Sequence, residues 1–114
     1  MTVNSVTLDN VTDDTFADSV IAASSGRTVL VEFWAEWCPP CRALSPILEQ
    51  LAAEHPDTLI VVKVNADDNV RTASEYRALA LPTMKLFRDG EVVKTIVGAK
   101  PKAALEADLA GLLG

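Results

Sequence analysis

The sequence predicts an α/β fold in which helices cover both faces of a mixed, five-stranded β-sheet. Three observations support this. Thr28–Trp34 and residues 59–64 are apolar runs without alternation, as in central strands buried on both faces. A helical pattern separates the two runs, so they form a right-handed βαβ unit with parallel strands. Asp89-Gly90 separates two later strand-like runs and favours a tight hairpin turn.

Length and composition limit the domain count and the partners. The chain has 114 residues, 49% hydrophobic and 23% charged, so we expect a single domain over residues 1–114 with its own core. A formal net charge of −6 opposes binding to nucleic acid, where basic side chains supply most of the affinity. It equally opposes anionic membrane surfaces. No signal peptide or membrane-spanning run is visible, so we expect a cytoplasmic protein.

The expected element order is β-α-β-α-β-α-β-β-α, which has five strands and four helices. Residues 3–8 alternate weakly and predict a short first strand. Thr12 is expected to cap a helix over residues 13–23. Asp13 and Asp14 lie in its first turn, where carboxylates complement the helix dipole. The buried strand Thr28–Trp34 follows.

The second helix is expected from Pro39 to about His55, because proline is tolerated in a first turn. Pro46 lies inside it and predicts a kink. After the strand at residues 59–64, residues 68–79 predict a third helix. The apolar face of the second helix consists of Leu44, Ile47, Leu48 and Leu51.

The C-terminal part predicts a hairpin and a last helix. Thr83–Arg88 and Glu91–Val97 flank Asp89-Gly90, the pair that favours a type I′ turn, so these strands should be antiparallel. Pro101 opens the final helix. Its apolar stripe consists of Leu105, Leu109, Leu112 and Leu113.

The two cysteines lie in Trp37-Cys38-Pro39-Pro40-Cys41, between a buried strand and a helix. Cys38 occupies the cap position, where free N–H groups and the helix dipole favour thiolate over thiol. Cys41 lies one turn into the helix, on the same face and within disulfide reach. This arrangement predicts that Cys38 attacks a substrate disulfide and that Cys41 resolves the resulting mixed disulfide.

Three other interpretations of the cysteines are weaker. Two buried thiols without chemistry would not require this spacing at a helix start. A structural zinc site needs four ligands, and the chain offers two cysteines and His55, so no metal is expected. His55 lies about 21 Å beyond Cys41 along the same expected helix, too far to serve as the base of a cysteine protease.

Six segments spread over about residues 5 to 113 carry a further pattern. They are Phe33-Trp34-Ala35-Glu36-Trp37-Cys38, Pro46-Ile47-Leu48, Lys63-Val64-Asn65-Ala66-Asp67, Leu81-Pro82-Thr83, Asp89-Gly90-Glu91 and Val97-Gly98-Ala99. In this order they resemble the thioredoxin family. The resemblance implies the thioredoxin fold and general reduction of protein disulfides. It also implies a monomer with no bound cofactor beyond a reversible Cys38–Cys41 disulfide. A thioredoxin reductase would recharge it with electrons from NADPH.

The resemblance also implies how disulfide-containing protein substrates dock. Leu81-Pro82-Thr83 matches the family's cis-proline loop, which faces the disulfide and offers backbone hydrogen bonds to the substrate. A flat apolar patch around Cys38 would complete the docking surface. Its residues would be Trp37, Pro40, Pro82, Gly98 and Ala99.

Two positions depart from the family pattern. Glu32 stands where the family has a buried aspartate, and the resemblance implies that this carboxyl accepts the proton of the resolving cysteine. Burial of Glu32 should raise its pKa. We expect Glu32 to keep this role with Lys63 as its partner on the adjacent strand; the alternative is a simple Glu32–Lys63 ion pair. Pro39 replaces the usual glycine, so Pro39 and Pro40 should tune the redox potential.

The sequence is compatible with three functions. The first is a protein-disulfide reductase that carries electrons as a dithiol. The second is a disulfide isomerase or oxidase with a more oxidising potential, which Pro39 keeps open. The third is a docking subunit whose binding is independent of redox chemistry.

Overall fold

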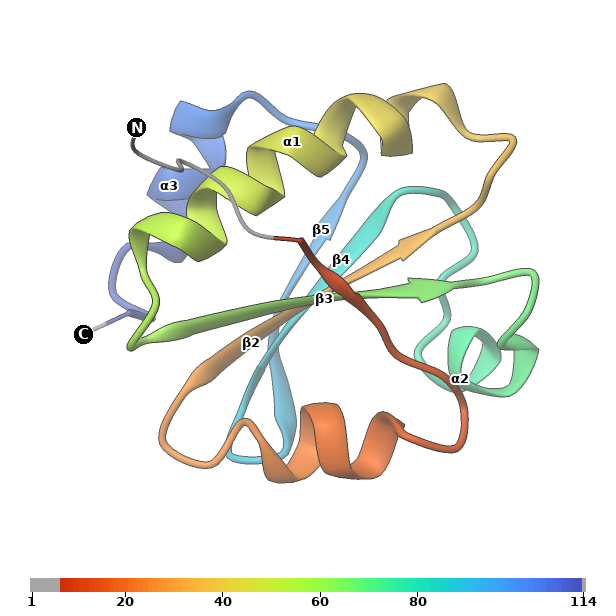
Figure 1. Ribbon diagram of the computed structural model, residues 1–114, viewed down its shortest axis with the longest axis horizontal. Helices are drawn as coiled ribbons and strands as arrows, with labels where there is room; N and C mark the ends of the chain where they lie inside the picture. The colour runs from red at the N-terminus through yellow and green to blue at the C-terminus, as the bar shows by residue number, and fades with distance from the viewer. Residues whose placement is uncertain (1–6, 114) are drawn as a thin grey trace.

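The computed structural model describes residues 7–113 and shows a sheet with helices on both sides (Figure 1). The order of elements agrees with the expected order, and the first helix is a π-helix, η1. The elements are β1 (Asp9–Asn10), η1 (Ala17–Ala22), β2 (Thr28–Trp34), α1 (Pro39–Glu54), β3 (Leu59–Asn65), α2 (Val70–Glu75), β4 (Thr83–Arg88), β5 (Glu91–Val97) and α3 (Lys102–Leu109).

The five strands form one mixed sheet in the order β1-β3-β2-β4-β5. β2 and β3 pair in parallel, whereas β4 is antiparallel to both β2 and β5. The predicted βαβ unit and hairpin are therefore confirmed. Asp89 and Gly90 have positive φ angles of 52° and 82°, the backbone that a type I′ turn requires at both central positions.

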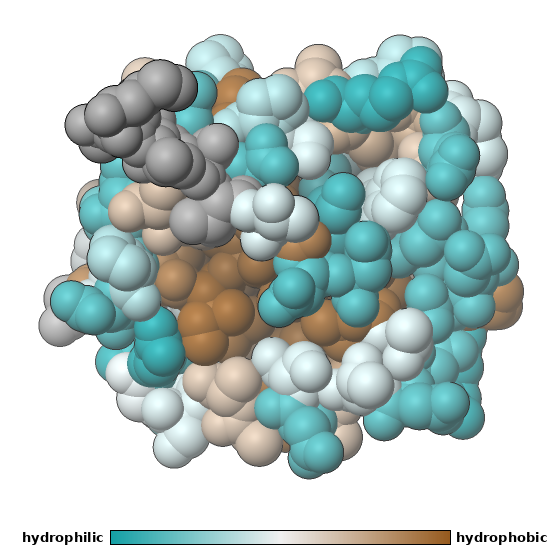
Figure 2. All heavy atoms as spheres, viewed as in Figure 1, coloured by the Kyte–Doolittle hydropathy of each residue, from teal (hydrophilic) through white to brown (hydrophobic). Residues whose placement is uncertain are grey.

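Alternation along β2 divides the core into two layers. Leu30 packs with α1 and α3 in one cluster, while Val29, Val31 and Phe33 pack with η1 and α2 in the other. On the face of the molecule drawn in Figure 2, hydrophobic residues gather between the helices above and below the sheet. Glu32 shares the face of Leu30, so its side chain lies on the α1 side of the sheet.

The N-terminal expectations need correction. Residues 3–6 of the expected first strand lie outside the described part of the chain, and the strand itself lies at Asp9–Asn10. Thr12 does not cap a helix, because its hydroxyl bonds the hydroxyl of Thr15, 3.2 Å away. Asp13 accepts hydrogen bonds from the N–H and hydroxyl of Thr72, at 2.8 and 2.5 Å, and thereby ties the start of this segment to α2.

Two helices are shorter than their sequence patterns predict. The α2 helix covers Val70–Glu75 rather than residues 68–79. Asn65 accepts hydrogen bonds from the N–H groups of Asp67 and Asp68 and so forms a turn before the helix, and Arg77 leaves helical geometry with a φ of 54°. The α3 helix ends at Leu109, so Leu112 and Leu113 lie beyond it, although they still pack on the core.

Candidate active site

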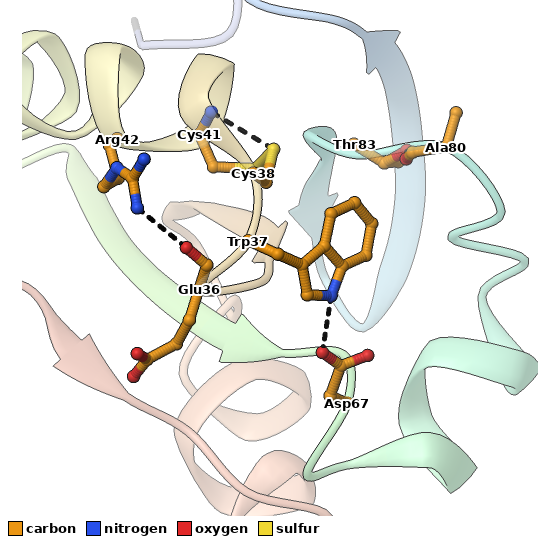
Figure 3. Close-up of a disulfide and its surroundings, with 8 residues drawn as sticks. All are labelled: Glu36, Trp37, Cys38, Cys41, Arg42, Asp67, Ala80 and Thr83. Carbon is orange, nitrogen blue, oxygen red and sulfur yellow. Dashed lines mark hydrogen bonds between the residues drawn. A yellow bond between two sulfur atoms is a disulfide. The ribbon is translucent and has the colours of Figure 1, made fainter.

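Cys38 and Cys41 lie where the chain leaves β2 and enters α1 (Figure 3). Cys38 is the N-cap of α1, with extended backbone, and the two prolines that follow occupy the first helical turn. Its Sγ accepts a hydrogen bond from the N–H of Cys41 at 3.3 Å. The two cysteines form a disulfide, with 5.3 Å between their Cα atoms. The helix start therefore presents an N–H group directly to the sulfur of Cys38.

Two side-chain hydrogen bonds fix the connection between β2 and α1. Arg42 donates a hydrogen bond from its guanidinium to the carbonyl of Glu36 at 2.8 Å. The Trp37 indole lies below the disulfide in Figure 3 and donates from Nε1 to the Asp67 carboxylate at 2.8 Å. Trp37 is 66% exposed, so this bond holds a large apolar ring in place at the surface beside the cysteines.

The loop before β4 packs against the cysteine pair. The Leu81-Pro82 peptide bond is cis, as the resemblance implies. Leu81 contacts the small cluster formed by Ala35 and both cysteines. The N–H of Gly98 donates to the carbonyl of Pro82 at 2.8 Å, so the end of β5 lies beside the same loop. Of the remaining residues expected on this surface, Pro40 and Ala99 are exposed.

A surface pocket of about 240 Å³ lies next to Trp37 and was not expected from the sequence. Val70 and Leu79 contribute to its wall and are 62% and 90% exposed. In the sequence, both residues lie within the helical pattern expected over residues 68–79, with Val70 near its start and Leu79 at its end. Their one local signal is a large apolar side chain, which is more often buried. The other lining residues are Ala66, Asp67, Ala73, Ser74, Ala78 and Leu81.

Glu32 is buried beneath the cysteines, with 1% of its surface exposed. Burial raises its pKa from an ordinary 4.5 to about 7, and the positive charge of Lys63 opposes this rise only in part. Its Oε2 has no hydrogen-bond partner within the described residues. The predicted burial and raised pKa of this carboxyl are therefore confirmed.

Glu32 and Cys41 line the same cavity of about 140 Å³, together with Trp34, Arg42, Ser45 and Lys63. This volume is large enough for water, because a cavity of roughly 10–15 Å³ already holds one water molecule. Lys63 pairs with Glu32 in strand register. Among residues 7–113, however, no ion pair joins the two side chains. The Lys63 ammonium instead lies 4.6 Å from the centre of the Trp34 ring.

His55 lies at the C-terminal end of α1, far along the helix from Cys41, and is half-buried there. In the part of the chain that the structure describes, no three His, Cys, Asp or Glu side chains gather as a metal site. Over the same residues, every helix is too short or too polar to cross a lipid bilayer.

The sequence comparisons agree with this geometry. The family model "Thioredoxin" matches residues 7–111. A thioredoxin from Streptomyces clavuligerus is 54% identical over 98 residues, which cover 86% of this chain and 89% of that protein. A thioredoxin from Mycolicibacterium smegmatis is 50% identical over 105 residues, which cover 90% and 92% of the two chains. The chain also matches a "Bifunctional thioredoxin reductase/thioredoxin" from Mycobacterium leprae, at 47% identity over 103 residues, which cover 90% of this chain and 22% of that protein.

The fold, the paired cysteines at the start of α1 and these similarities lead to one assignment. Two cysteines that close and open a disulfide carry two electrons. The chain belongs to the thioredoxin family, and it is a protein-disulfide oxidoreductase that carries electrons as a dithiol/disulfide pair.

Proposed function

We propose that this protein is a general reductant of protein disulfides, with Cys38 as the attacking sulfur and Cys41 as the resolving one. The observation that carries the proposal is the position of Cys38 at the cap of α1, where its Sγ accepts the N–H of Cys41. A hydrogen bond to the charged form of a group, together with the helix dipole, lowers the pKa of a thiol and increases its thiolate fraction.

The electron transfer takes place in two displacements. First, the Cys38 thiolate attacks a substrate sulfur; a bond forms between them, and the other substrate sulfur leaves as a thiolate and is protonated. Second, Cys41 loses its proton and attacks Cys38. The Cys38–Cys41 bond forms, the bond to the substrate breaks, and the second substrate thiol is released. The substrate gains two electrons, and the protein dithiol is oxidised.

Glu32 is proposed to accept the proton of Cys41 before the second displacement, with water in the shared cavity as the path. Two observations support this role: the carboxyl lines the cavity that Cys41 also lines, and its pKa of about 7 suits proton exchange near neutral pH. Glutamate is one methylene longer than the aspartate of the family, so it extends further from β2 towards α1.

Glu32→Ala is expected to slow release of reduced substrate by about 100-fold near neutral pH and below. The deficit should shrink at high pH, because hydroxide then deprotonates Cys41 directly. Stopped-flow measurement of mixed-disulfide resolution between pH 5.5 and pH 9 tests this. Glu32→Asp keeps a carboxylate and is the matched control. If the rate and its pH profile are the same in Glu32→Ala and the wild type, Glu32 does not transfer the proton.

Substrates are proposed to dock on the surface formed by Trp37, Pro40, Leu81, Pro82, Gly98 and Ala99. The fixed, exposed Trp37 ring and the packing of Leu81 against the cysteines support this surface. The pocket walled by Val70 and Leu79 extends it on the side of α2. An apolar side chain of the substrate next to its disulfide would be buried there.

We propose that a thioredoxin reductase recharges the Cys38–Cys41 pair with electrons from NADPH. The M. leprae relative, whose name joins the two activities in one chain, supports this partnership. The cytosol keeps protein thiols reduced, so a reductant of this kind would work there. Residues 1–114 are proposed to be a single domain, and the monomeric state stays a prediction.

Equilibration with glutathione distinguishes a reductant from an isomerase or oxidase. We expect the reduction potential of the Cys38–Cys41 couple to be about −270 mV, as for reducing dithiols of this class. A value near about −180 mV would instead favour an isomerase. Pro39→Gly, measured alongside, reports how much Pro39, which lacks an N–H beside the sulfur, moves the potential. The measurement is the fraction of oxidised protein as a function of the glutathione ratio, after acid quenching and alkylation.

A further inference from the structure

Three side chains share the α1 side of the sheet at the wall of the Glu32 cavity. Trp34 follows Glu32 by two positions on β2, so both side chains lie on one face. Lys63 is the register partner of Glu32 on the parallel strand β3. From this position the ammonium has two acceptors within reach of one flexible side chain: the carboxyl of Glu32 and the π face of Trp34.

The ammonium lies on the ring. Lys63 Nζ is 4.6 Å from the centre of the Trp34 ring, within the range of a cation–π interaction, for which tryptophan is the strongest aromatic partner. Glu32 is left with an oxygen that has no hydrogen-bond partner in the described part of the chain. A direct ion pair would have lowered the pKa of this carboxyl, whereas burial dominates and raises it.

We propose that Trp34 is a positioning residue whose ring holds the Lys63 ammonium away from Glu32, so that the Glu32 carboxyl stays unpaired and open to the cavity beside Cys41. The proposal rests on the role of Glu32 proposed above and extends it to the residue that keeps the carboxyl available. Trp34 itself has no part in the displacement of sulfur.

Few other groups face Glu32. On β4 its register partner is Met84, which has no charge. From α1, the cavity wall receives Arg42, Ser45 and Cys41, of which Cys41 titrates only when the disulfide is reduced. The Arg42 guanidinium donates a hydrogen bond to the backbone carbonyl of Glu36 and not to the Glu32 carboxyl. Lys63 is therefore the cation on the cavity wall whose position decides the charge next to Glu32.

The test is the titration of the Glu32 carboxyl in the oxidised protein, followed by its carboxyl ¹³C shift with Glu32→Gln to assign the signal. Neither cysteine titrates in this state, so Glu32 is observed alone. Trp34→Leu is expected to lower the titration midpoint by about one pH unit, because the released ammonium then pairs with the carboxylate. Trp34→Phe keeps a π face and should stay closer to the wild type. An unchanged midpoint in Trp34→Leu would overturn the proposal.

The Lys63→Met variant shows whether the effect passes through the ammonium. Lys63→Met alone should raise the Glu32 midpoint, since it removes the opposing positive charge. In the Lys63→Met background, Trp34→Leu should not change the Glu32 midpoint any further. If Trp34→Leu lowers the midpoint equally with and without Lys63, the ring acts through solvation and not through the lysine, and the proposal is wrong.

A measurement on the unaltered chain covers the case in which Trp34→Leu does not fold. The ring current of Trp34 should move the ε-methylene proton signals of Lys63 upfield of ordinary lysines, and Trp34→Phe should reduce this displacement. Signals at ordinary positions would overturn the proposal. None of these measurements involves turnover, so the position of Lys63 and the proton transfer by Glu32 can each fail without the other.

Discussion

Cys41→Ser should stop catalytic reduction of insulin disulfides and accumulate a mixed disulfide between Cys38 and the substrate. The second displacement is intramolecular in the native protein, and reactions of well-oriented neighbours exceed their bimolecular counterparts by several orders of magnitude. We therefore expect turnover to fall by about a thousandfold or more. Insulin precipitation gives the rate, and non-reducing electrophoresis followed by mass spectrometry identifies the adduct on Cys38.

The matched control is Cys38→Ser, which should neither turn over nor form an adduct, because the remaining thiol, on Cys41, lies inside α1 and lacks the N-cap position that lowers the pKa of a thiol. Adducts on Cys41 would reverse the proposed roles of the two cysteines. The docking-subunit alternative would be favoured by two results together: partners still bind after both cysteines are replaced, and the native protein has no reductase activity. The proteins trapped by Cys41→Ser also show whether the substrates are folded cytosolic proteins or secreted chains still folding.

The buried Glu32 should lower the stability of the wild type more in neutral and alkaline solution than in acid. Its pKa is about 7 in the folded protein and 4.5 ordinarily, so the folded state binds more protons between these two values. The free energy of unfolding therefore falls as pH rises through this window and levels off above pH 7. The full effect of this one group is about 3 kcal/mol, at about 1.4 kcal/mol per pH unit.

Glu32→Gln removes this dependence, because glutamine does not ionise. Urea unfolding of the oxidised wild type and variant at pH 4.5, 6 and 8 tests the prediction through the difference between their unfolding free energies. This difference should move in favour of the variant as pH rises. Asp13 and Asp108, whose pKa values are lowered by their hydrogen bonds to Thr72 and Lys100, respectively, contribute equally to both proteins and cancel. Parallel stability curves would show that the pKa of Glu32 is the same in the folded and the unfolded protein, so that its burial does not raise it.

The features that could be predicted from the sequence depend on neighbours a few residues apart. A separation of three residues places Cys38 and Cys41 on one helical turn, and Pro39 marks where that helix begins. Asp89 and Gly90 tolerate the positive φ angles of the hairpin turn. Neither inference needs knowledge of the rest of the chain.

The failures have the opposite origin. Thr12 has the residue type of a helix cap, but the neighbouring Asp13 is held by Thr72, 59 positions away, and the segment follows that contact instead. Leu79 is the expected end of a helix over residues 68–79, but the chain leaves helical geometry at Arg77, and Leu79 is 90% exposed beside Trp37. Such competition between local preference and distant contacts is invisible in a single sequence.

Local patterns were thus enough to identify the α/β fold and the dithiol at a helix start, because apolar runs, tight turns and the spacing of the two cysteines are visible in residues that are close in the sequence. The state of Glu32 and the place of Lys63 required the folded chain. Desolvation of the Glu32 carboxyl depends on the packing of α1 over the sheet. Whether the Lys63 ammonium contacts this carboxyl or the Trp34 ring depends on the pairing of β2 and β3, which brings the three side chains together.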